Sequence, residues 1–336
     1  MSDDSVRVGV IGAGNMGTDH ARQLHRWVSG ASVVLVADLA IERAKEVAAE
    51  VGAGATDDPR QVIDDSAVDA VIVASHDSTH ADLVRACVRA GKPVLCEKPL
   101  AVTLQEATAL VTEVGADGAR LISVGFMRRF DPGYGRLKTA IRSGDLGTPL
   151  MLHCTGRGVT SGPGTTSESS ITNSAIHDLD IVPWLLDAPA IEVAWVAPRQ
   201  SGLADGFQDP QILLLRTADG VLSTVETYLN ARYGYDVRCE AVCETGAASL
   251  AEPAMLVTDS ALRRSVAYAK DWRPRFAEAY RLELSAWVAS VALGRPPIEP
   301  MATAGDGLAA AAVAEAAVTS MRGGGGFARV PGVPNQ

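Results

Sequence analysis

Residues 1–126 alternate between short apolar runs and longer amphipathic segments. The amphipathic segments IERAKEVAAEVG and ADLVRACVRAG predict helices. The apolar runs predict buried strands at VRVGVI, VVLVA, VDAVIVAS, PVLC and LISVGF. Apolar strands that alternate with helices are typical of a parallel sheet with both faces covered. We therefore expect an α/β fold whose domain 1–126 is of the Rossmann type.

The pattern changes near residue 127. RRFDPGYGRLKTAIRSG predicts a helical connector, and several strands with short turns follow it, the first of them in LMLHCTGRG. Helices are expected at 174–186, 272–291 and 305–321. Residues 127–336 are thus predicted to form an α+β domain on an open, mainly antiparallel sheet, with MRGGGGFARVPGVPNQ as a loose tail or an arm laid on a neighbour.

One predicted helix, in NSAIHDLDIVPWLL (173–186), carries polar groups where apolar ones are expected. In α-helical spacing Asn173, His177, Asp180 and Trp184 stand at i, i+4, i+7 and i+11, so they would share one face. From spacing alone, His177 is better explained as a hydrogen-bonded core histidine than as a functional one.

The composition limits the possible partners. The chain has 336 residues, enough for two domains, and is 47% hydrophobic and 21% charged, as in ordinary globular proteins. A net charge of −10 disfavours a nucleic-acid surface, which needs clustered Lys and Arg. The acidic start MSDDSVRVGV does not resemble a signal peptide, and no apolar run reaches about 18 residues. We expect neither nucleic acid nor membrane as a partner.

The five cysteines are odd in number and scattered at 87, 96, 154, 239 and 243. We interpret them as free thiols, which indicates a reducing compartment and therefore the cytoplasm. Cys239 and Cys243 have the spacing of a metal pair, but no His or further Cys lies near them in sequence. No metal site is expected.

A glycine motif stands between the first strand and the first helix. Gly12, Gly14 and Gly17 form G-x-G-x-x-G, in which the first glycine permits the turn, the second lets a pyrophosphate approach and the third lets helix and strand pack. Asp38 ends the second strand 21 residues after Gly17, where a carboxylate accepts the ribose hydroxyls and repels a 2′-phosphate. The motif predicts NAD as cofactor, in preference to NADP.

Lys98 in CEKPL follows an apolar strand at the carboxyl edge of the predicted sheet, where such folds bind ligands. A lysine beside the nicotinamide could stabilise a developing alkoxide. A surface lysine in a turn explains the position equally well.

Taken together, GAGNMG, EKPLA, GFMRRFDP, IHDLD, RYGYDVRCE and DWRPRFAEAY resemble the Gfo/Idh/MocA oxidoreductases, and most of all their inositol 2-dehydrogenase branch. The resemblance extends from Val8 to about residue 321. It implies a histidine acid/base that follows an acidic residue by four positions on a helix, assisted by the lysine of EKP. His177 matches that histidine and Lys98 that lysine.

The resemblance implies three groups of site residues. Catalysis falls to Lys98, His177 and Asn173. Cofactor contacts are expected at Gly12, Gly14, Asn15, Met16, Gly17, Asp38, Ser75, His76, Glu97, Lys98, Met127 and Trp272. Substrate contacts are expected at Lys98, Met127, Arg128, His153, Asn173, His177, Asp180 and Tyr235. Tyr235 and Trp272 are equally consistent with simple packing, as is Tyr280.

Two departures from the family pattern affect the expected polyol pocket. Asn173 stands where the family usually has Asp, so it can orient a partner by hydrogen bonds but cannot stabilise an imidazolium by charge. The second is Gly156-Arg157-Gly158-Val159, where inositol dehydrogenases tend to carry His-Arg-Asn-Pro, followed by the loop TSGPGTTSESS. The substrate could therefore differ from myo-inositol.

The sequence thus predicts an NAD-dependent dehydrogenase that oxidises a secondary hydroxyl of a cyclitol and, by family analogy, a homo-oligomer, as a tetramer. One alternative is a sugar or amino-cyclitol dehydrogenase of a biosynthetic pathway. The other is a non-catalytic regulator that binds the dinucleotide, although a regulator would need neither Lys98 nor His177.

Overall fold

A computed structural model describes residues 5–251 and 256–332. The chain divides into two compact units. The first comprises Met1–Phe130 and Glu278–Ala311, and the second comprises Asp131–Ala277 and Ala312–Gln336. The sequence placed the boundary after residue 126 and did not anticipate that a late segment joins the first unit.

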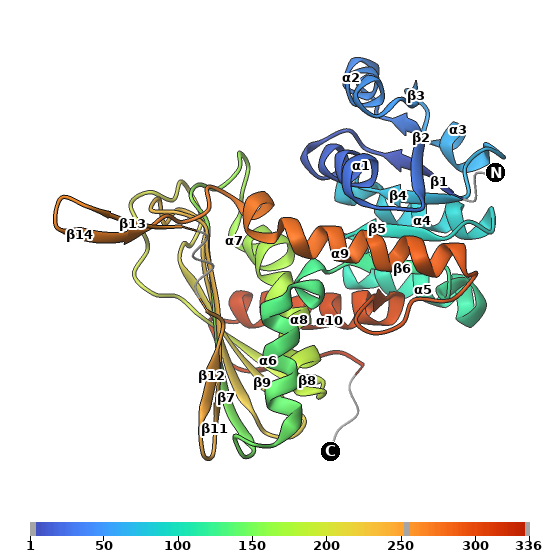
Figure 1. Cartoon of the computed structure of the whole chain (residues 1–336). Helices are drawn as coiled ribbons and strands as arrows, with labels where there is room; N and C mark the ends of the chain where they lie inside the picture. The colour runs from blue at the N-terminus through green and yellow to red at the C-terminus, as the bar shows by residue number, and fades with distance from the viewer. Residues whose placement is uncertain (1–4, 252–255, 333–336) are drawn as a thin grey trace. The chain divides into compact units, whose positions relative to one another are not determined.

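The first unit is built on a seven-stranded sheet in the order β15-β6-β5-β4-β1-β2-β3 (Figure 1). Its strands are β1 (Val6–Ile11), β2 (Ala31–Ala37), β3 (Gly54–Thr56), β4 (Ala70–Val73), β5 (Val94–Glu97), β6 (Ile122–Gly125) and β15 (Ala302–Thr303). All neighbours are parallel except β15, which is antiparallel to β6. β4, β5 and β6 are buried along their whole length, as expected of a sheet covered on both faces. The Rossmann prediction is confirmed.

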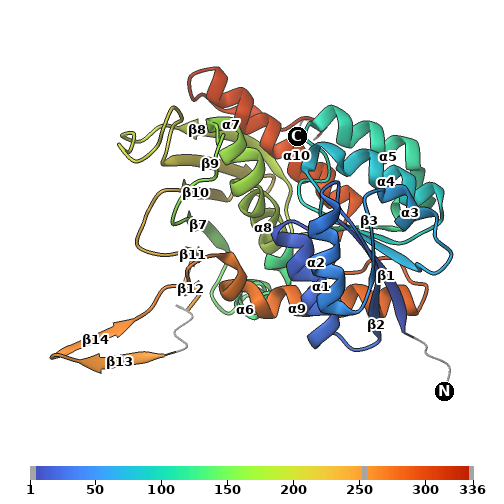
Figure 2. The same cartoon turned by 90° about the horizontal axis from the view of Figure 1, so that it is seen from above.

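Helices connect these strands and pack on them. They are α1 (Asn15–Trp27), α2 (Ile41–Val51), α3 (Pro59–Asp64), the 3₁₀ turn η1 (Asp77–Thr79), α4 (His80–Arg89), α5 (Leu104–Ala119) and the 3₁₀ turn η2 (Met127–Phe130). α4 and α5 lie against each other (Figure 2). α5 begins at a capping box, because the side chains of Thr103 and Glu106 each accept the other's backbone N–H.

The second unit is built on another seven-stranded sheet, in the order β12-β11-β7-β10-β9-β8-β16. Its strands are β7 (Pro149–Arg157), β8 (Ala190–Val196), β9 (Gln211–Thr217), β10 (Leu222–Tyr228), β11 (Asp236–Cys243), β12 (Ala247–Ser249) and β16 (Ala328–Arg329). β7 and β10 are parallel and all other pairs antiparallel, so the predicted mainly antiparallel sheet is confirmed. Alternating burial along β9 and β10 shows that one face is covered.

The helices of the second unit correct one expectation. α6 (Pro132–Ser143) follows the first unit, and the segment after β7 forms α7 (Ser167–Ser169), the π-helix η3 (Ser170–Ala175) and α8 (Ile176–Leu186). Asn173 therefore lies in a π-helix, whereas the sequence placed it on the same α-helical stripe as His177. Because π-helical bonds span one more residue than α-helical bonds, the i, i+4 argument fails for this pair.

Two long helices contribute to both units: α9 (Trp272–Ala292) and α10 (Ala304–Arg322). The tail was expected to be loose or laid on a neighbour. Instead, its strand β16 pairs with β8 of the same chain, and residues 333–336 lie outside the described part. An exposed hairpin of β13 (Val257–Ser260) and β14 (Arg263–Val266) extends from the second unit.

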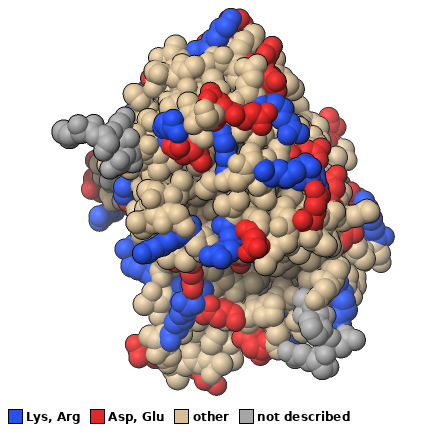
Figure 3. Space-filling view, turned by 90° about the vertical axis from the view of Figure 1, so that its right-hand side faces the viewer, with Lys and Arg blue, Asp and Glu red and all other residues tan. Residues whose placement is uncertain are grey.

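The charges on the face drawn in Figure 3 are mixed, with basic and acidic side chains interspersed. Within residues 5–251 and 256–332, no helix is both long and apolar enough to span a membrane.

Candidate functional site

The glycine motif forms the turn between β1 and α1, and each glycine has its own structural reason. Gly12 has a φ of 102°, which favours glycine, and a Cβ on Gly17 would lie 1.8 Å from the Gly12 carbonyl oxygen. A Cβ on Gly14 would meet no protein atom within 4 Å. The chain's own packing therefore requires Gly12 and Gly17 but not Gly14.

The turn suits a dinucleotide. Gly14 is the N-cap of α1 and has no side chain, and Asn15 and Met16 follow in the first helical turn. The first N–H groups of a helix have no acceptor within the helix and so favour a phosphate. The open space beside Gly14 is the space that a pyrophosphate needs.

Asp38 lies directly after β2 and is tied to this turn. Its carboxylate accepts the N–H of Ala13 and of Ala40, each at 2.8 Å, and pairs with Arg43 at 2.9 Å. Burial alone would raise the pKa of Asp38, but the two N–H groups and the guanidinium lower it. The group is therefore a fixed carboxylate, as recognition of ribose hydroxyls requires.

We expect Asp38→Asn to weaken the discrimination between NADH and NADPH by about 10-fold or more, because the amide keeps the shape and removes the charge that repels a 2′-phosphate. The measurement is the Kd of both cofactors by fluorescence titration. Glu42→Gln is the matched control, since Glu42 lies exposed on the first turn of α2 and forms an ion pair with Lys45. A wild type that prefers NADPH would remove Asp38 from its assigned role.

Lys98 follows β5 at the carboxyl edge of the first sheet and is half-buried. The preceding residue, Glu97, is buried, and its Oε2 accepts the backbone N–H of Lys98 at 3.2 Å. Burial lowers the pKa of the Lys98 ammonium, and the positive charge of Arg128 lowers it further. The carboxylates of Glu97 and Asp77 raise this pKa, but the net shift is downward. A lysine whose pKa is lowered gives up and regains a proton more readily near neutral pH.

Three other predicted cofactor residues lie at the same edge of the first sheet. Ser75 follows β4, and its hydroxyl lies 2.6 Å from that of Thr79. His76 is exposed and caps η1. Met127 and the predicted substrate residue Arg128 are buried in η2, which follows β6. β4, β5 and β6 are parallel neighbours, so their carboxyl ends lie at one edge of the sheet. These residues are thereby brought together within the first unit.

In the second unit, α8 carries His177 and Asp180. His177 is half-buried and Asp180 is buried, whereas Asn173 on the preceding π-helix is exposed. Trp184 near the end of α8 is held by Lys138, whose ammonium lies 4.1 Å from its ring centroid and donates to its carbonyl oxygen. π-Helical turns occur often at functional sites, and this one sets where Asn173 lies relative to α8.

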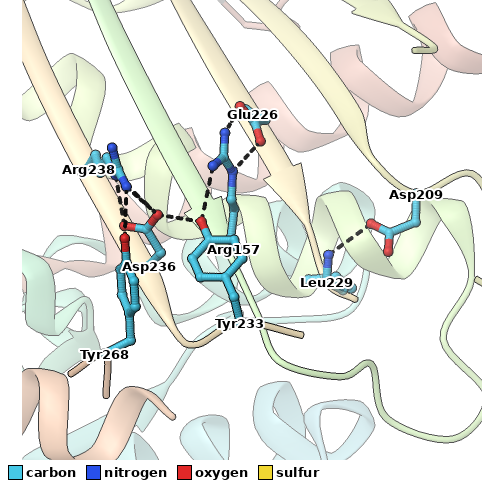
Figure 4. Close-up of polar contacts among 8 residues, drawn as sticks. All are labelled: Arg157, Asp209, Glu226, Leu229, Tyr233, Asp236, Arg238 and Tyr268. Atoms are coloured by element: carbon cyan, nitrogen blue, oxygen red, sulfur yellow. Dashed lines mark hydrogen bonds and ion pairs between the residues drawn. The ribbon is translucent and has the colours of Figure 1, made fainter. Parts of the chain in front are cut away.

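The altered sequence Gly156-Arg157-Gly158 lies at the end of β7, and its arginine is engaged within the sheet (Figure 4). Arg157 donates to Glu226 through Nε at 2.6 Å and Nη2 at 2.9 Å, and to the Tyr233 hydroxyl at 3.0 Å. The hydrogen bonds to Glu226 raise the pKa of Arg157. Arg157 therefore braces the loop of Tyr233 and Tyr235 against the parallel strands β7 and β10.

A buried carboxylate reinforces the same edge. Asp209 is fully buried and accepts the N–H groups of Leu229 and Asn230 and the side-chain amide of Asn230. The Asn230 side chain in turn accepts the N–H of Ser161 at 3.1 Å. Together these bonds fasten the loop that leads from β7 to the helix of His177 to the loop after β10. Figure 4 shows one of them, between Asp209 and Leu229.

Three aromatic residues that the sequence singled out have packing roles that can be stated. The Tyr235 N–H donates to the Ala269 carbonyl oxygen at 2.8 Å, and its ring stands edge-on to Phe276 at 6.3 Å. Trp272 begins α9 and lies under the Arg273 guanidinium. Tyr280 is a buried aromatic that packs on His20.

His153 is the candidate that the structure separates from His177. It is exposed on β7, where its Nδ1 lies 2.9 Å from the Thr224 hydroxyl. Its neighbours Leu152 and Cys154 are buried on the opposite face, against which α8 packs. Successive side chains of a strand point to opposite faces, so the sheet lies between His153 and the helix of His177. The assignment of His153 to the substrate site is not retained.

Sequence reasoning missed two histidines, His20 and His80, both buried at the edge that carries Lys98. His20 lies three residues after Gly17, and His80 opens α4. Their polarity on otherwise buried helix faces was the signal that could have found them.

No group of three or more His, Cys, Asp or Glu able to hold a metal ion occurs among the described residues. The five cysteines are buried free thiols, including Cys154 and Cys239, whose sulfurs lie 3.6 Å apart on neighbouring strands.

Comparison with known families agrees with this geometry. Residues 6–126 match the Gfo/Idh/MocA model described as an oxidoreductase family with an NAD-binding Rossmann fold, and residues 134–249 match the Gfo/Idh/MocA C-terminal domain. The chain belongs to the Gfo/Idh/MocA family. Like the family's Rossmann domain, it uses NAD, and it is an oxidoreductase.

Relatives of this Gfo/Idh/MocA chain include inositol 2-dehydrogenase 2 of Paenarthrobacter aurescens, which is 53% identical over 97% of this chain and 98% of the relative. Inositol 2-dehydrogenase 1 of Saccharopolyspora erythraea is 46% identical over 95% of each chain. Among solved structures, myo-inositol dehydrogenase of Lactobacillus casei, in complex with NAD(H) and myo-inositol, has a TM-score of 0.91 and 31% identity and covers 99% of this chain and 98% of its own.

Proposed function

We propose that this protein oxidises a secondary hydroxyl of a cyclitol to the ketone, with myo-inositol as the first candidate substrate. The observation that carries the proposal is the identity of 53% across nearly the whole length of a relative named inositol 2-dehydrogenase. The similarity to a structure described with NAD(H) and myo-inositol supports the same substrate class.

We assign removal of the hydroxyl proton to His177 and stabilisation of the resulting alkoxide to the ammonium of Lys98. The lowered pKa of Lys98 keeps its proton available to an oxyanion. Bound NAD supplies the acceptor for the hydride. Asn173 lacks the charge of an aspartate, so we assign it a hydrogen-bonding role toward the substrate or the imidazole.

The remaining site residues are assigned by the family motifs. Gly12, Gly14, Asn15, Met16, Gly17 and Asp38 bind the pyrophosphate and ribose. Ser75, His76, Glu97, Met127 and Trp272 complete the cofactor contacts. Arg128, Asp180 and Tyr235 join Lys98, Asn173 and His177 as contacts to the polyol.

We further propose a cytoplasmic homotetramer. Buried free thiols support a reducing compartment. Exposed Met151 on β7, half-buried Leu222 on β10, and half-buried Leu214 and Ile212 on β9 give the open face of the second sheet an apolar character that suits contact between copies.

The test is a panel of polyols with NAD, read as NADH absorbance. We expect myo-inositol or a close stereoisomer to give the highest kcat/KM, because the relatives carry that name and Lys98 and His177 are both retained. Activity confined to sugars or amino-cyclitols would replace the cyclitol assignment with the biosynthetic alternative. Tight NADH binding without turnover of any polyol would favour the regulator.

A further inference from the structure

Two buried histidines flank the turn Glu97-Lys98-Pro99, and the chemistry assigned above uses neither of them. His20 lies on α1 and is fully buried, and His80 opens α4 with 1% exposure. Both belong to the first unit, and the polar partners of both lie at this turn or beside it.

His20 is connected to the lysine through one carboxylate. Its Nε2 lies 2.7 Å from Glu97 Oε1, while Glu97 Oε2 accepts the backbone N–H of Lys98 at 3.2 Å. The carboxylate has little freedom, because a Cβ on Gly125 would already lie 3.2 Å from its carboxyl carbon. The His20 ring is also confined, with the Tyr280 ring edge-on at 5.8 Å.

His80 holds the other side of the turn. Its Nδ1 lies 2.7 Å from the Pro99 carbonyl oxygen and its Nε2 lies 3.2 Å from the Ser75 carbonyl oxygen. The ring therefore bridges the carboxyl ends of β4 and β5.

We propose that His20 and His80 are positioning residues for the reaction at Lys98: His20 keeps Glu97 oriented and ionised beneath the lysine, and His80 fixes the chain that follows it. The proposal rests on the function proposed above for Lys98, and neither histidine is assigned a contact with the substrate. It groups the half-buried Lys98 with three buried side chains, those of His20, Glu97 and His80.

The electrostatics give His20 a measurable signature. Burial raises the pKa of Glu97, the hydrogen bond and charge of His20 lower it, Lys98 and His80 lower it further, and the net shift is downward. For Lys98, burial lowers the pKa, Glu97 and Asp77 raise it, and Arg128 lowers it. Loss of His20 therefore favours a protonated Glu97, which removes a charge that keeps the Lys98 proton in place.

The experiment compares His20→Leu with His20→Gln, since the glutamine amide can donate from a position close to Nε2. We expect His20→Leu to lower kcat about 10-fold and to move the basic limb of kcat/KM down by about one pH unit, because the ammonium is needed for the alkoxide. His20→Gln should recover most of both. The KM for NAD should change little in either variant.

The corresponding pair for His80 is His80→Leu and His80→Asn. The asparagine amide can donate from a position close to Nδ1 and should therefore restore the contact. His80→Leu should lower kcat about 10-fold with little change in the KM for NAD, and His80→Asn should recover much of it. His25→Leu, on the exposed end of α1, is the control and should resemble the wild type.

A second readout does not depend on turnover. The chain has only five lysines, so the Lys98 signal in ¹³C-lysine-labelled protein can be assigned by its loss in Lys98→Arg and titrated by NMR. We expect a lower Lys98 pKa in His20→Leu and a restored one in His20→Gln. If the wild type oxidises no polyol, the proposed function fails, while this titration still decides whether His20 acts on the lysine.

Two results would overturn the inference. One is an unchanged Lys98 pKa in His20→Leu together with wild-type kcat in both leucine variants. The other is an equal loss of activity and of melting temperature in the leucine variants and their amide counterparts, which would mean that both histidines serve only the packing of the first unit.

Discussion

Lys98→Ala and His177→Ala should each reduce kcat by about 10²- to 10⁴-fold on the polyol that the wild type oxidises, the range that a positioned acid or base contributes. His177 would no longer take the hydroxyl proton, and Lys98 would no longer stabilise the alkoxide. Both variants should fold, because each side chain is only half-buried, and both should bind NADH. Steady-state kinetics and NADH titration measure the two properties separately.

The chain offers matched controls for both substitutions. Lys92 precedes β5 just as Lys98 follows it, and its ammonium donates to the Asp65 carbonyl oxygen, so Lys92→Ala tests the loss of a lysine at the opposite end of the strand. His25→Ala does the same for an exposed histidine. Near-normal kcat in Lys98→Ala or His177→Ala would refute the assigned chemistry, and a joint loss of NADH binding would indicate a structural role.

Gly17→Ala and Gly14→Ala each change one glycine of the same motif, but they should affect different properties. The first should lower the stability of the cofactor-free protein, and the second should lower the affinity for the cofactor. A Cβ at Gly17 would lie 1.8 Å from a backbone oxygen, so we expect it to destabilise the cofactor-free protein by about 3 kcal/mol or more. A Cβ at Gly14 meets no protein atom and φ is −76°, so stability without NAD should change by less than about 1 kcal/mol.

Gly14→Ala should instead impair cofactor binding, because the methyl group would occupy the space assigned to the pyrophosphate. We expect its NADH affinity to fall at least about 10-fold. Denaturant unfolding without cofactor and NADH titration give the two quantities. If Gly14→Ala binds NADH as tightly as the wild type, the pyrophosphate does not lie beside Gly14.

The sequence was sufficient where the determining interactions are local. The strand, glycine turn and helix of residues 6–27 are encoded by apolar runs and by glycines with specific steric tasks, and the structure contains each of them. The same holds for β5, whose apolar run leads directly to Lys98. Neighbouring residues determine such features, so they can be recognised without knowledge of the fold.

Other features depend on contacts between distant residues and could not be predicted from periodicity. β15 joins the first sheet from residue 302, because it pairs with β6 almost 180 residues earlier. The parallel pair of β7 and β10 likewise follows from a long connection. The hydrogen bond from His20 to Glu97 spans 77 residues, and nothing in either local sequence announces it.

The π-helix before α8 shows a different limit. A helix was predicted from residue 174, but the segment is already helical at Ser167, after a capping box of Thr166 and Ser169, and passes through a π-helical section before α8. Hydrophobic spacing distinguishes helix from strand but not one helical hydrogen-bond pattern from another.

The most direct test of the central claim follows one hydrogen atom from substrate to cofactor. Purified wild-type protein is supplied with NAD and myo-inositol that carries deuterium on its C2 carbon, and the product is examined by NADH absorbance and by mass spectrometry of the nicotinamide. The account predicts NADH that carries the deuterium, formed by the wild type and reduced by at least about 100-fold in Lys98→Ala and in His177→Ala. Deuterium-free NADH, or labelled NADH formed equally fast by these variants, would contradict it.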